Sequence, residues 1–411
     1  MHTQHKTTVH NEKKFRLADF FDEHWDEYIK KPKEYILPEQ YKAVSAMRAC
    51  RTEALGVEHY VCKECGEVSF MYHSCKNRFC PTCSWKDTIQ WAKKIKNDML
   101  DIPHRHVVFT LPHKLNELIK DNRGSLLKIL FQVSADSLKD WMWHKYKLTP
   151  GIISVLHTFG EKKDFHTHIH MIVSWGGITD DHAIKEIKGE YINYEFIQKK
   201  FRCKFEDKLI ELFDAEALHH TFKNRISFMQ FVKQVNNKHW RIQFEPAIRL
   251  PEEVIRYIGR YSKRACMSEY KITNIENGYI SFSYKDYKDL DYHGKPIVKE
   301  LTLHYSEFFP RLLQHVPLPY FRLVRYYGAY AARTKAILKK RYPKNTIEED
   351  SHAEEPEEDI YELPHNPKIC KNCNTEKTYM YTAFKTKDGK RIIMSRYKPK
   401  KMNELFKENV A

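Results

Sequence analysis

The chain has 411 residues and a formal charge of +16, because 70 Lys and Arg residues outnumber 54 Asp and Glu residues. Hydrophobic residues make up 42% of the chain and aromatic residues 13%, which is enough to build packed cores and excludes wholesale disorder. The surplus of cations favours a polyanionic partner, most simply nucleic acid, although some basic proteins only carry solvated lysines.

Neither membrane insertion nor secretion is expected. No apolar run approaches the ~18 residues that a spanning helix needs, and the segment from Met1 to Lys6 lacks the hydrophobic core of a signal peptide. In the reducing cytosol the ten cysteines are expected to be thiols or metal ligands, not disulfides.

The first hundred residues are expected to combine helices with a cysteine-rich module. Apolar positions between Phe20 and Ile29 are spaced for one helix face, so residues 15–55 are predicted to be helical. The module runs from Cys62 to Cys83, and another helix is predicted from Trp85 to Leu100.

Strand and helix patterns alternate over residues 101–342. Strands are predicted at 104–111, 152–159 and 166–175, with a hairpin-like connection at 160–164 and a helix at 116–146. A charged, mostly helical insertion follows around 178–238. The remaining predicted elements are a short strand at 240–244, a helix that begins at Pro251, antiparallel strands over 278–305 and a basic aromatic helix over 319–341.

The end of the chain changes composition sharply. The acidic segment from Glu348 to Glu362 is best interpreted as a solvated linker, and a basic tail follows it. The tail carries Cys370-x2-Cys373, half a zinc site that would need another segment or another chain to complete it. We therefore expect three domains, at residues 1–100, 101–342 and 343–411.

Two Cys-x2-Cys pairs in the cysteine-rich module predict a structural zinc site. Cys62, Cys65, Cys80 and Cys83 can supply four thiolates to one tetrahedral Zn²⁺, which leaves no open position for a substrate. His73 and Cys75 compete for the same places, and unmetallated buried cysteines are the alternative. Cations such as Arg78 favour contact between this module and DNA, whereas the plainer interpretation is a module that only supports protein–protein contacts.

A histidine-rich strand indicates a second kind of metal site. In the segment 166–175, apolar residues occupy one face of the strand, and His166, His168 and His170 occupy the other. A lone histidine is usually a core or surface residue, but three imidazoles about 7 Å apart on one face can converge on a cation when a further ligand is supplied.

Downstream, a helix with two tyrosines begins at Pro251. Tyr257 and Tyr261 lie one turn apart on one stripe, and Arg260 and Arg264 add positive charge around them. Taken alone, the stripe is typical of core packing or of a platform for stacking bases. Beside a bound cation, a tyrosine phenol can instead attack a phosphodiester and form a phosphotyrosine bond.

These motifs together resemble a known family. His168-Ile169-His170 resembles the His-hydrophobic-His motif of the HUH endonuclease superfamily, and Tyr257-x3-Tyr261 resembles the paired nucleophiles of its two-tyrosine insertion-sequence transposases, the insertion-sequence ninety-one family. The stretches 73–83, 257–264 and Arg325-Tyr326-Tyr327-Gly328 are also similar to that family, in one order over about residues 15–335.

The resemblance implies a transposase that nicks single-stranded DNA at element ends through 5′-phosphotyrosine intermediates and transfers strands, as in rolling-circle transposition. It implies Mg²⁺ or Mn²⁺ held by His168 and His170, with Tyr257 and Tyr261 as nucleophiles. The third metal ligand stays open, since His166 lies on the right face and His157 would oppose it across the hairpin in a suitable register. DNA, as single-stranded or hairpin ends and as target, is the implied partner, in the bacterial cytoplasm at the nucleoid. Neither the oligomeric state nor the division of roles between the tyrosines follows from the sequence.

We therefore expect an α+β protein, in which an antiparallel sheet with flanking helices of the HUH endonuclease type follows a small zinc-binding module. Arg260, Arg264, Arg78 and Arg325 are the predicted DNA-binding cations. A replication initiator or relaxase with the same chemistry is the nearest alternative. A non-catalytic, zinc-dependent DNA-binding protein is the alternative from another class.

Overall fold

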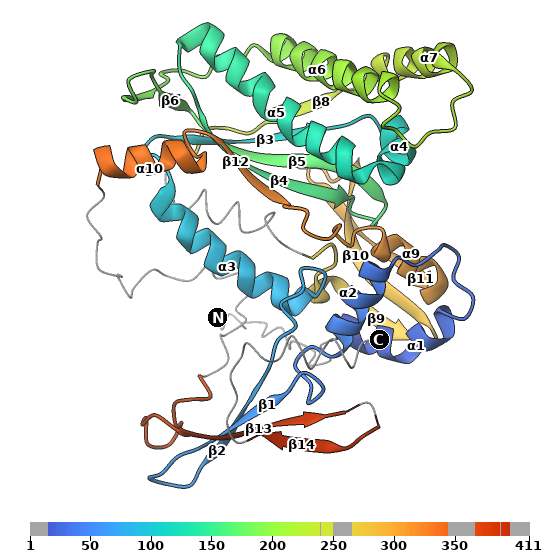
Figure 1. Ribbon diagram of the computed structural model, residues 1–411, viewed down its shortest axis with the longest axis vertical. Coiled ribbons are helices and arrows are strands. Elements are labelled where there is room, and N and C mark those ends of the chain that lie inside the picture. The colour runs from blue at the N-terminus through green and yellow to red at the C-terminus, as the bar shows by residue number, and fades with distance from the viewer. Residues whose placement is uncertain (1–14, 239, 250–264, 344–365, 387, 395–411) are drawn as a thin grey trace, which may run out of the picture.

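The computed structural model describes residues 15–238, 240–249, 265–343, 366–386 and 388–394 (Figure 1). Its helices and antiparallel strands confirm the α+β class, with helices on both sides of a central sheet. None of the described helices is long and apolar enough to cross a membrane.

The central sheet has the strand order β12-β4-β5-β3-β8, and every neighbouring pair is antiparallel. Strands β4 and β5 form the predicted hairpin at its centre, and β3 pairs with the far side of β5. The strands are β3 (His104–Thr110), β4 (Gly151–Phe159), β5 (Phe165–Ser174), β8 (Arg241–Phe244) and β12 (Val324–Gly328).

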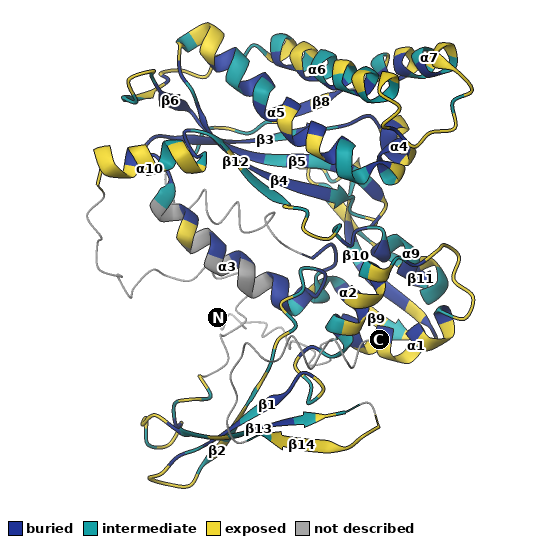
Figure 2. Cartoon of the chain, in the orientation of Figure 1, coloured by how far each residue is buried: buried dark blue, intermediate teal, exposed yellow. Residues whose placement is uncertain are grey.

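One face of this sheet is covered by α5 (Arg123–Tyr146) and α6 (Tyr194–Asp214), with α7 (Arg225–Asn236) at the side (Figure 1). Alternate strand residues, such as Phe109, Ile169 and Met171, enter the core beneath these helices. Figure 2 shows the strands mostly buried and the outer surfaces of the helices exposed. Short elements complete this side of the protein: η1 (His113–Leu115), α4 (Asn116–Asp121), β6 (Gly176–Ile178) and β7 (Ile184–Glu186).

The opposite sheet face packs on two other helices. The residues Trp91 and Ile95 of α3 (Pro81–Asp98) and Leu338 of α10 (Ala332–Arg341) share a core with Ile153 and Ile172 of the sheet. The Trp91 indole donates a hydrogen bond to the Tyr326 hydroxyl at 2.8 Å, so α3 is joined directly to β12.

A second core joins the start of the chain to residues 272–316. Phe21 of α1 stacks on Phe309 of α9, with ring centroids 4.1 Å apart. This part of the molecule consists of α1 (Leu17–Tyr28), α2 (Pro38–Arg48), η2 (Glu269–Lys271), β9 (Ile272–Glu276), β10 (Tyr279–Leu290), β11 (Pro296–His304) and α9 (Tyr305–Leu313). The predicted continuous helix over 15–55 is thus two helices, since Pro32 and Pro38 interrupt it.

A four-stranded sheet in the order β14-β13-β1-β2 joins both ends of the described chain. It consists of β1 (Val57–Val61), β2 (Val68–Tyr72), β13 (Thr378–Lys385) and β14 (Arg391–Met394). This contact and the core shared by α1 and α9 run across the domain boundaries expected at residues 100 and 343.

The predicted helix over 319–341 is wrong in its first half. Residues 324–328 form the edge strand β12, paired with β4, and only 332–341 are helical. Tertiary packing explains the difference. Val324 packs in the core on the α3 side of the sheet, whereas Arg325 and Tyr327 pack in the core on the α5 side. This alternation of neighbouring residues between two faces is that of a strand.

Candidate functional site

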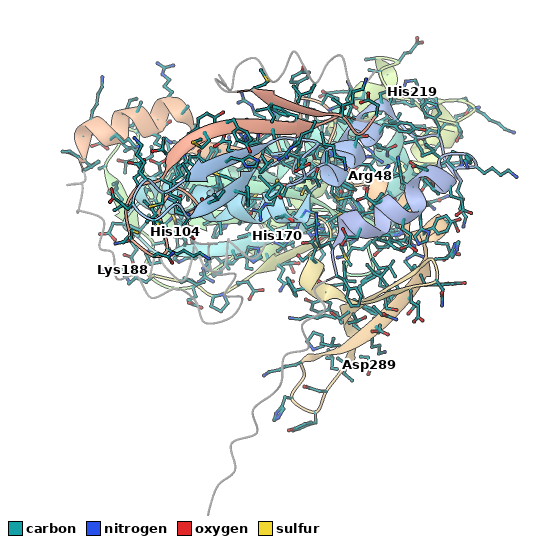
Figure 3. All side chains as sticks on the ribbon, turned by 90° about the horizontal axis from the view of Figure 1, so that it is seen from below. Arg48, His104, His170, Lys188, His219 and Asp289 are labelled. Carbon is teal, nitrogen blue, oxygen red and sulfur yellow. The ribbon has the colours of Figure 1, made fainter. Side chains whose placement is uncertain are left out.

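The histidines gather on the sheet face opposite α5. Register across the hairpin pairs His157 of β4 with His168 of β5, so both imidazoles leave the sheet on one side. His170 is two residues further along β5 and therefore shares that face. In Figure 3, His104 and His170 lie on the side of the sheet that is seen from below.

Three imidazoles are close enough to hold one ion. One ring nitrogen from each of His157, His168 and His170 lies within 4.8 Å of the others. The ring centroid of His157 is 4.6 Å from that of His170, and the centroids of His168 and His170 are 4.9 Å apart. Neutral imidazole nitrogens at this spacing suit a divalent cation.

Hydrogen bonds orient two of the rings. His168 Nδ1 donates to the backbone oxygen of His166 at 3.0 Å, which leaves Nε2 as the nitrogen that could bind a metal. His170 Nδ1 lies 2.8 Å from Nε2 of His106 on β3, so one of these two nitrogens donates to the other. Metal-binding histidines commonly have a partner of this kind on the second ring nitrogen.

Burial lowers the pKa values of two histidines of this group and of a neighbouring third. It lowers the pKa of His168 and of His170 well below 6.5, and repulsion from the neighbouring His157 lowers both further. Burial also lowers the pKa of His106 to about 4. His106, His168 and His170 are therefore in the neutral form, which is the form that coordinates metals, over the physiological pH range.

His166 does not join the group of three. Its ring centroid lies 5.2 Å from that of His168, but its nitrogens are outside the cluster of ligand atoms. The strand pairing accounts for this, because it shifts between His157 and Phe159, and His157 stands opposite His168 instead. Of the two open candidates for the third ligand, the geometry brings His157 to the other two histidines.

The predicted nucleophiles Tyr257 and Tyr261, with Arg260 and Arg264, lie outside the described residues. On one side of that segment, Ile248 bridges to His104 at the end of β3. On the other side, the backbone nitrogen of Ala265 donates to Ser84 Oγ at the start of α3.

The expected single zinc site is corrected to two separate groups of cysteines. Cys80 and Cys83, at the start of α3, join Cys50 and Cys75, whereas Cys62 and Cys65 join Cys370 and Cys373. The two pairs diverge because one occupies the turn between β1 and β2 and the other begins a helix packed on α2.

The first group is built into the N-terminal core. Cys83 Sγ lies 3.5 Å from Cys50 Sγ and from Cys75 Sγ, and the backbone nitrogen of Asn77 points to the Cys75 sulfur. Four thiolates without an open position make a structural zinc site. His73, a competing candidate, instead contacts Glu58 and the backbone of Leu55.

The two described arginines have different surroundings. Arg325 places its guanidinium over the Phe131 ring of α5, 4.5 Å from the ring centroid, within the limit of about 6 Å for a cation–π contact. Its side chain is therefore used in packing on the helix-covered sheet face. Arg78 is partly exposed in the loop before Cys80.

Sequence reasoning missed His106 and Cys50. His106 precedes His170 by 64 positions, and only the pairing of β3 with β5 brings the two together. The alternation of His104, His106 and Val108 on a predicted strand was the available signal. Cys50 has no Cys-x2-Cys spacing and falls at the end of a helix, so it carries no motif of its own.

Comparisons with known proteins match both the part of the chain that carries the histidine group and the part that carries the first cysteine group. A family described as "Putative transposase" matches residues 151–337, and one described as "Transposase zinc-binding domain" matches residues 20–111. "Putative transposase y4qJ" of Sinorhizobium fredii (strain NBRC 101917 / NGR234) is 30% identical over 298 residues, which cover 70% of this chain and 74% of that protein. "Transposase for insertion sequence element IS801" of Pseudomonas savastanoi pv. phaseolicola is 30% identical over 302 residues, 72% of this chain and 71% of that protein. No solved structure matches the chain.

Proposed function

The chain belongs to the IS91 family of insertion-sequence transposases, and from this premise we propose that it is a metal-dependent endonuclease and strand transferase for single-stranded DNA. It would nick the ends of its element through 5′-phosphotyrosine intermediates, as the two-tyrosine HUH enzymes do. The group formed by His157, His168 and His170 is the observation that carries the proposal.

The residues present fit a divalent ion, Mg²⁺ or Mn²⁺. His168 and His170 would offer their Nε2 atoms, since hydrogen bonds engage their Nδ1 atoms, and His157 would complete a three-nitrogen face. Such a face leaves positions for oxygen atoms of the DNA. When bound, the ion would neutralise charge on a phosphodiester and make its phosphorus a better electrophile.

The protein's own groups would hold this arrangement before DNA arrives. Strand pairing fixes His157 against His168, and His106 supports the ring of His170 from the adjacent strand. Because burial lowers the histidine pKa values, the nitrogens need not lose protons on binding a metal.

The chemical step is assigned to Tyr257 and Tyr261 on the strength of the family motif. A tyrosine oxygen would attack the phosphorus, forming a phosphotyrosine bond as the bond to the 3′-oxygen breaks and a 3′-hydroxyl departs. Attack by another 3′-hydroxyl would reverse the step and join strands without ATP. Arg260 and Arg264, one and three residues from Tyr261, would screen the negative charge.

The rest of the molecule is consistent with DNA as the partner. The formal charge of +16 favours association with phosphates, and Arg78 in the zinc-binding part is a partly exposed candidate contact. Arg325 would contribute through packing of β12 on α5 and not through phosphate contact.

The experiment incubates purified protein with end-derived single-stranded oligonucleotides and either Mg²⁺ or Mn²⁺. We expect a cut product that requires the ion, disappears on chelation, and is lost in the double variant Tyr257→Phe with Tyr261→Phe. Unchanged DNA binding with no cleavage by the wild-type protein would favour a non-catalytic binding protein. Recircularised products without insertion into a target would favour a replication initiator or relaxase.

A further inference from the structure

Four cysteines from opposite ends of the chain meet at one point. The sulfurs of Cys62, Cys65, Cys370 and Cys373 all lie within 4.8 Å of one another. We propose that these residues form a second structural zinc site, which fastens the C-terminal segment to the N-terminal β1–β2 hairpin. The proposal concerns architecture and does not rest on the nuclease activity.

Both halves of this site have the same backbone turn. The backbone amide of Cys62 donates to the backbone oxygen of Glu67 at 2.9 Å, and the backbone amide of Gly66 donates to the backbone oxygen of Cys62 at 2.9 Å. In the second half, the backbone amide of Cys370 donates to the backbone oxygen of Thr375 at 2.8 Å, and the backbone amide of Asn374 donates to the backbone oxygen of Cys370 at 3.0 Å.

The residue after each Cys-x2-Cys pair has a left-handed backbone. Gly66 has φ of 73° and Asn374 has φ of 55°, the two residue types that adopt this conformation most readily. Two segments from opposite ends of the described chain thus make the same turn, which directs both sulfurs of a pair to one side. This repetition is expected of a metal site with two equivalent halves.

The spacing of the sulfurs suits zinc and not a disulfide. Cys65 Sγ lies 3.5 Å from Cys370 Sγ, and all four cysteines have free thiols. Sulfurs bound tetrahedrally at about 2.3 Å from zinc are about 3.8 Å apart, whereas a disulfide bond is about 2.05 Å long. The observed separation is therefore close to that of a tetrahedral site.

Other contacts hold the same two segments together around the sulfurs. Strand β13 pairs with β1 from Val57 to Val61, which places the two turns side by side. The ammonium of Lys377, whose side chain is 1% exposed, lies 3.3 Å from a carboxylate oxygen of Glu67. The same Glu67 oxygen accepts a hydrogen bond from Cys370 Sγ at 2.8 Å. Because a zinc ion with four thiolates has a charge of −2, the buried Lys377 ammonium offsets the negative charge that the nearby Glu67 carboxylate adds to this region.

Neither matched family accounts for this site. The zinc-binding family ends at residue 111 and the transposase family at residue 337, so Cys370 and Cys373 lie beyond both. Because 305 positions separate Cys65 from Cys370, zinc here would close a very long loop and join the ends of the described chain.

Zinc content gives the first test on the full-length protein. We expect two zinc ions per chain in the wild type and one in the variant Cys370→Ser with Cys373→Ser. Cys203→Ser, at a partly buried cysteine outside both groups, is the matched control and should keep two. A wild type with one zinc ion, or a double variant that keeps two, would overturn the proposal.

Thiol labelling tests the unmodified protein and does not depend on the folding of a variant. Cys65 is exposed, so as a free thiol it should react rapidly with iodoacetamide under reducing conditions. With zinc bound, we expect Cys62, Cys65, Cys370 and Cys373 to be protected together and to become reactive together after chelation. Rapid labelling of Cys65 or Cys373 in the zinc-loaded monomer would contradict the site.

A cut in the intervening chain tests the fastening itself. A protease recognition sequence inserted after Glu357 allows the full-length protein to be cleaved between Arg341 and Cys370. The C-terminal fragment should stay with the rest of the chain in zinc and separate after chelation. Separation in the presence of zinc would show that the cysteines do not fasten these segments, and retention only in dimers would assign the site to two chains instead of one.

Discussion

His157 and His168 face each other across the β4–β5 hairpin, and burial lowers the pKa of His168 well below its usual value. Such a site would be sensitive to single substitutions, because three nitrogens would share the coordination of one ion and each is held by its own strand position. Single substitutions can therefore separate the histidines that would bind the ion, the histidine that supports one of them, and nearby histidines that do neither.

His157→Ala should abolish metal-dependent cleavage, whereas His166→Ala should retain it. The variants are well matched, since both remove an imidazole from the same hairpin, but only His157 belongs to the group of three. We expect Mn²⁺ affinity to fall by at least 100-fold for His157→Ala and by no more than a few-fold for His166→Ala, by analogy with losses at metal-supporting residues. Isothermal titration calorimetry measures the Mn²⁺ affinity of both variants. A larger loss of affinity for His166→Ala than for His157→Ala would make His166 the third ligand.

His106→Ala should weaken metal binding without removing a ligand. Its Nε2 lies 2.8 Å from Nδ1 of His170, so the variant loses the support that orients that ring. Loss of such a partner typically lowers metal affinity about 10–100-fold. Cleavage should then recover at high Mn²⁺ concentration, and a variant that stays inactive at saturating metal would mean that His106 acts in another way.

His315 should contribute a pH-dependent part of the stability. Its Nε2 donates to the Lys163 backbone oxygen at 3.1 Å, its Nδ1 accepts from Thr158, and burial lowers its pKa to about 3. The unfolded chain, with a histidine pKa of about 6.5, binds a proton that the folded protein does not, so stability falls as the pH drops from 6.5 toward 3.

The measurement is the free energy of unfolding from pH 7 to pH 4 for wild type and His315→Gln. The wild type should lose up to about 1.4 kcal/mol per pH unit more than the variant within that window. Parallel curves would show that His315 is not held neutral in the fold.

At the scale of elements, β5 was predictable and β12 was not. In β5, histidines alternate with Thr167, Ile169, Met171 and Val173, and this alternation fixes both the strand and the faces of its side chains. In 319–341, basic and aromatic residues fit either a helix or a strand, and pairing with β4 decides between them. Propensity is a weak guide where tertiary contacts compete with it.

The contact between α1 and α9 should contribute strongly to the stability of the second core. Phe309 is fully buried and stacks on Phe21, with further edge contacts to Trp25 and Tyr28. Phe309→Ala should lower the free energy of unfolding by about 3–5 kcal/mol, as large-to-small changes in cores do. Tyr35→Ala, at a side chain 81% exposed, is the control and should change it by less than about 0.5 kcal/mol. Chemical denaturation compares them, and equal effects would contradict the packing described.

At the scale of the whole molecule, what could be predicted from the sequence depends on how far apart along the chain the contacting residues lie. The α+β class and the cysteine and histidine motifs are local patterns, and they were visible in the chain. The grouping of Cys62 with Cys370, and of His170 with His106, depends on pairings of strands far apart in sequence, which local spacing does not encode. The one wrong zinc assignment arose from joining two Cys-x2-Cys pairs because they were neighbours in the sequence.

The most direct test of the central claim is to find the atom that carries the DNA after cleavage. Wild-type protein, Mn²⁺ and an end-derived single-stranded oligonucleotide are reacted, the product is digested with trypsin and nuclease, and the modified peptide is sequenced by mass spectrometry. The account predicts a 5′-phosphate on Tyr257 or Tyr261, absent when His157 is replaced by alanine. A phosphate on another residue, or cleavage with no covalent intermediate, would contradict it.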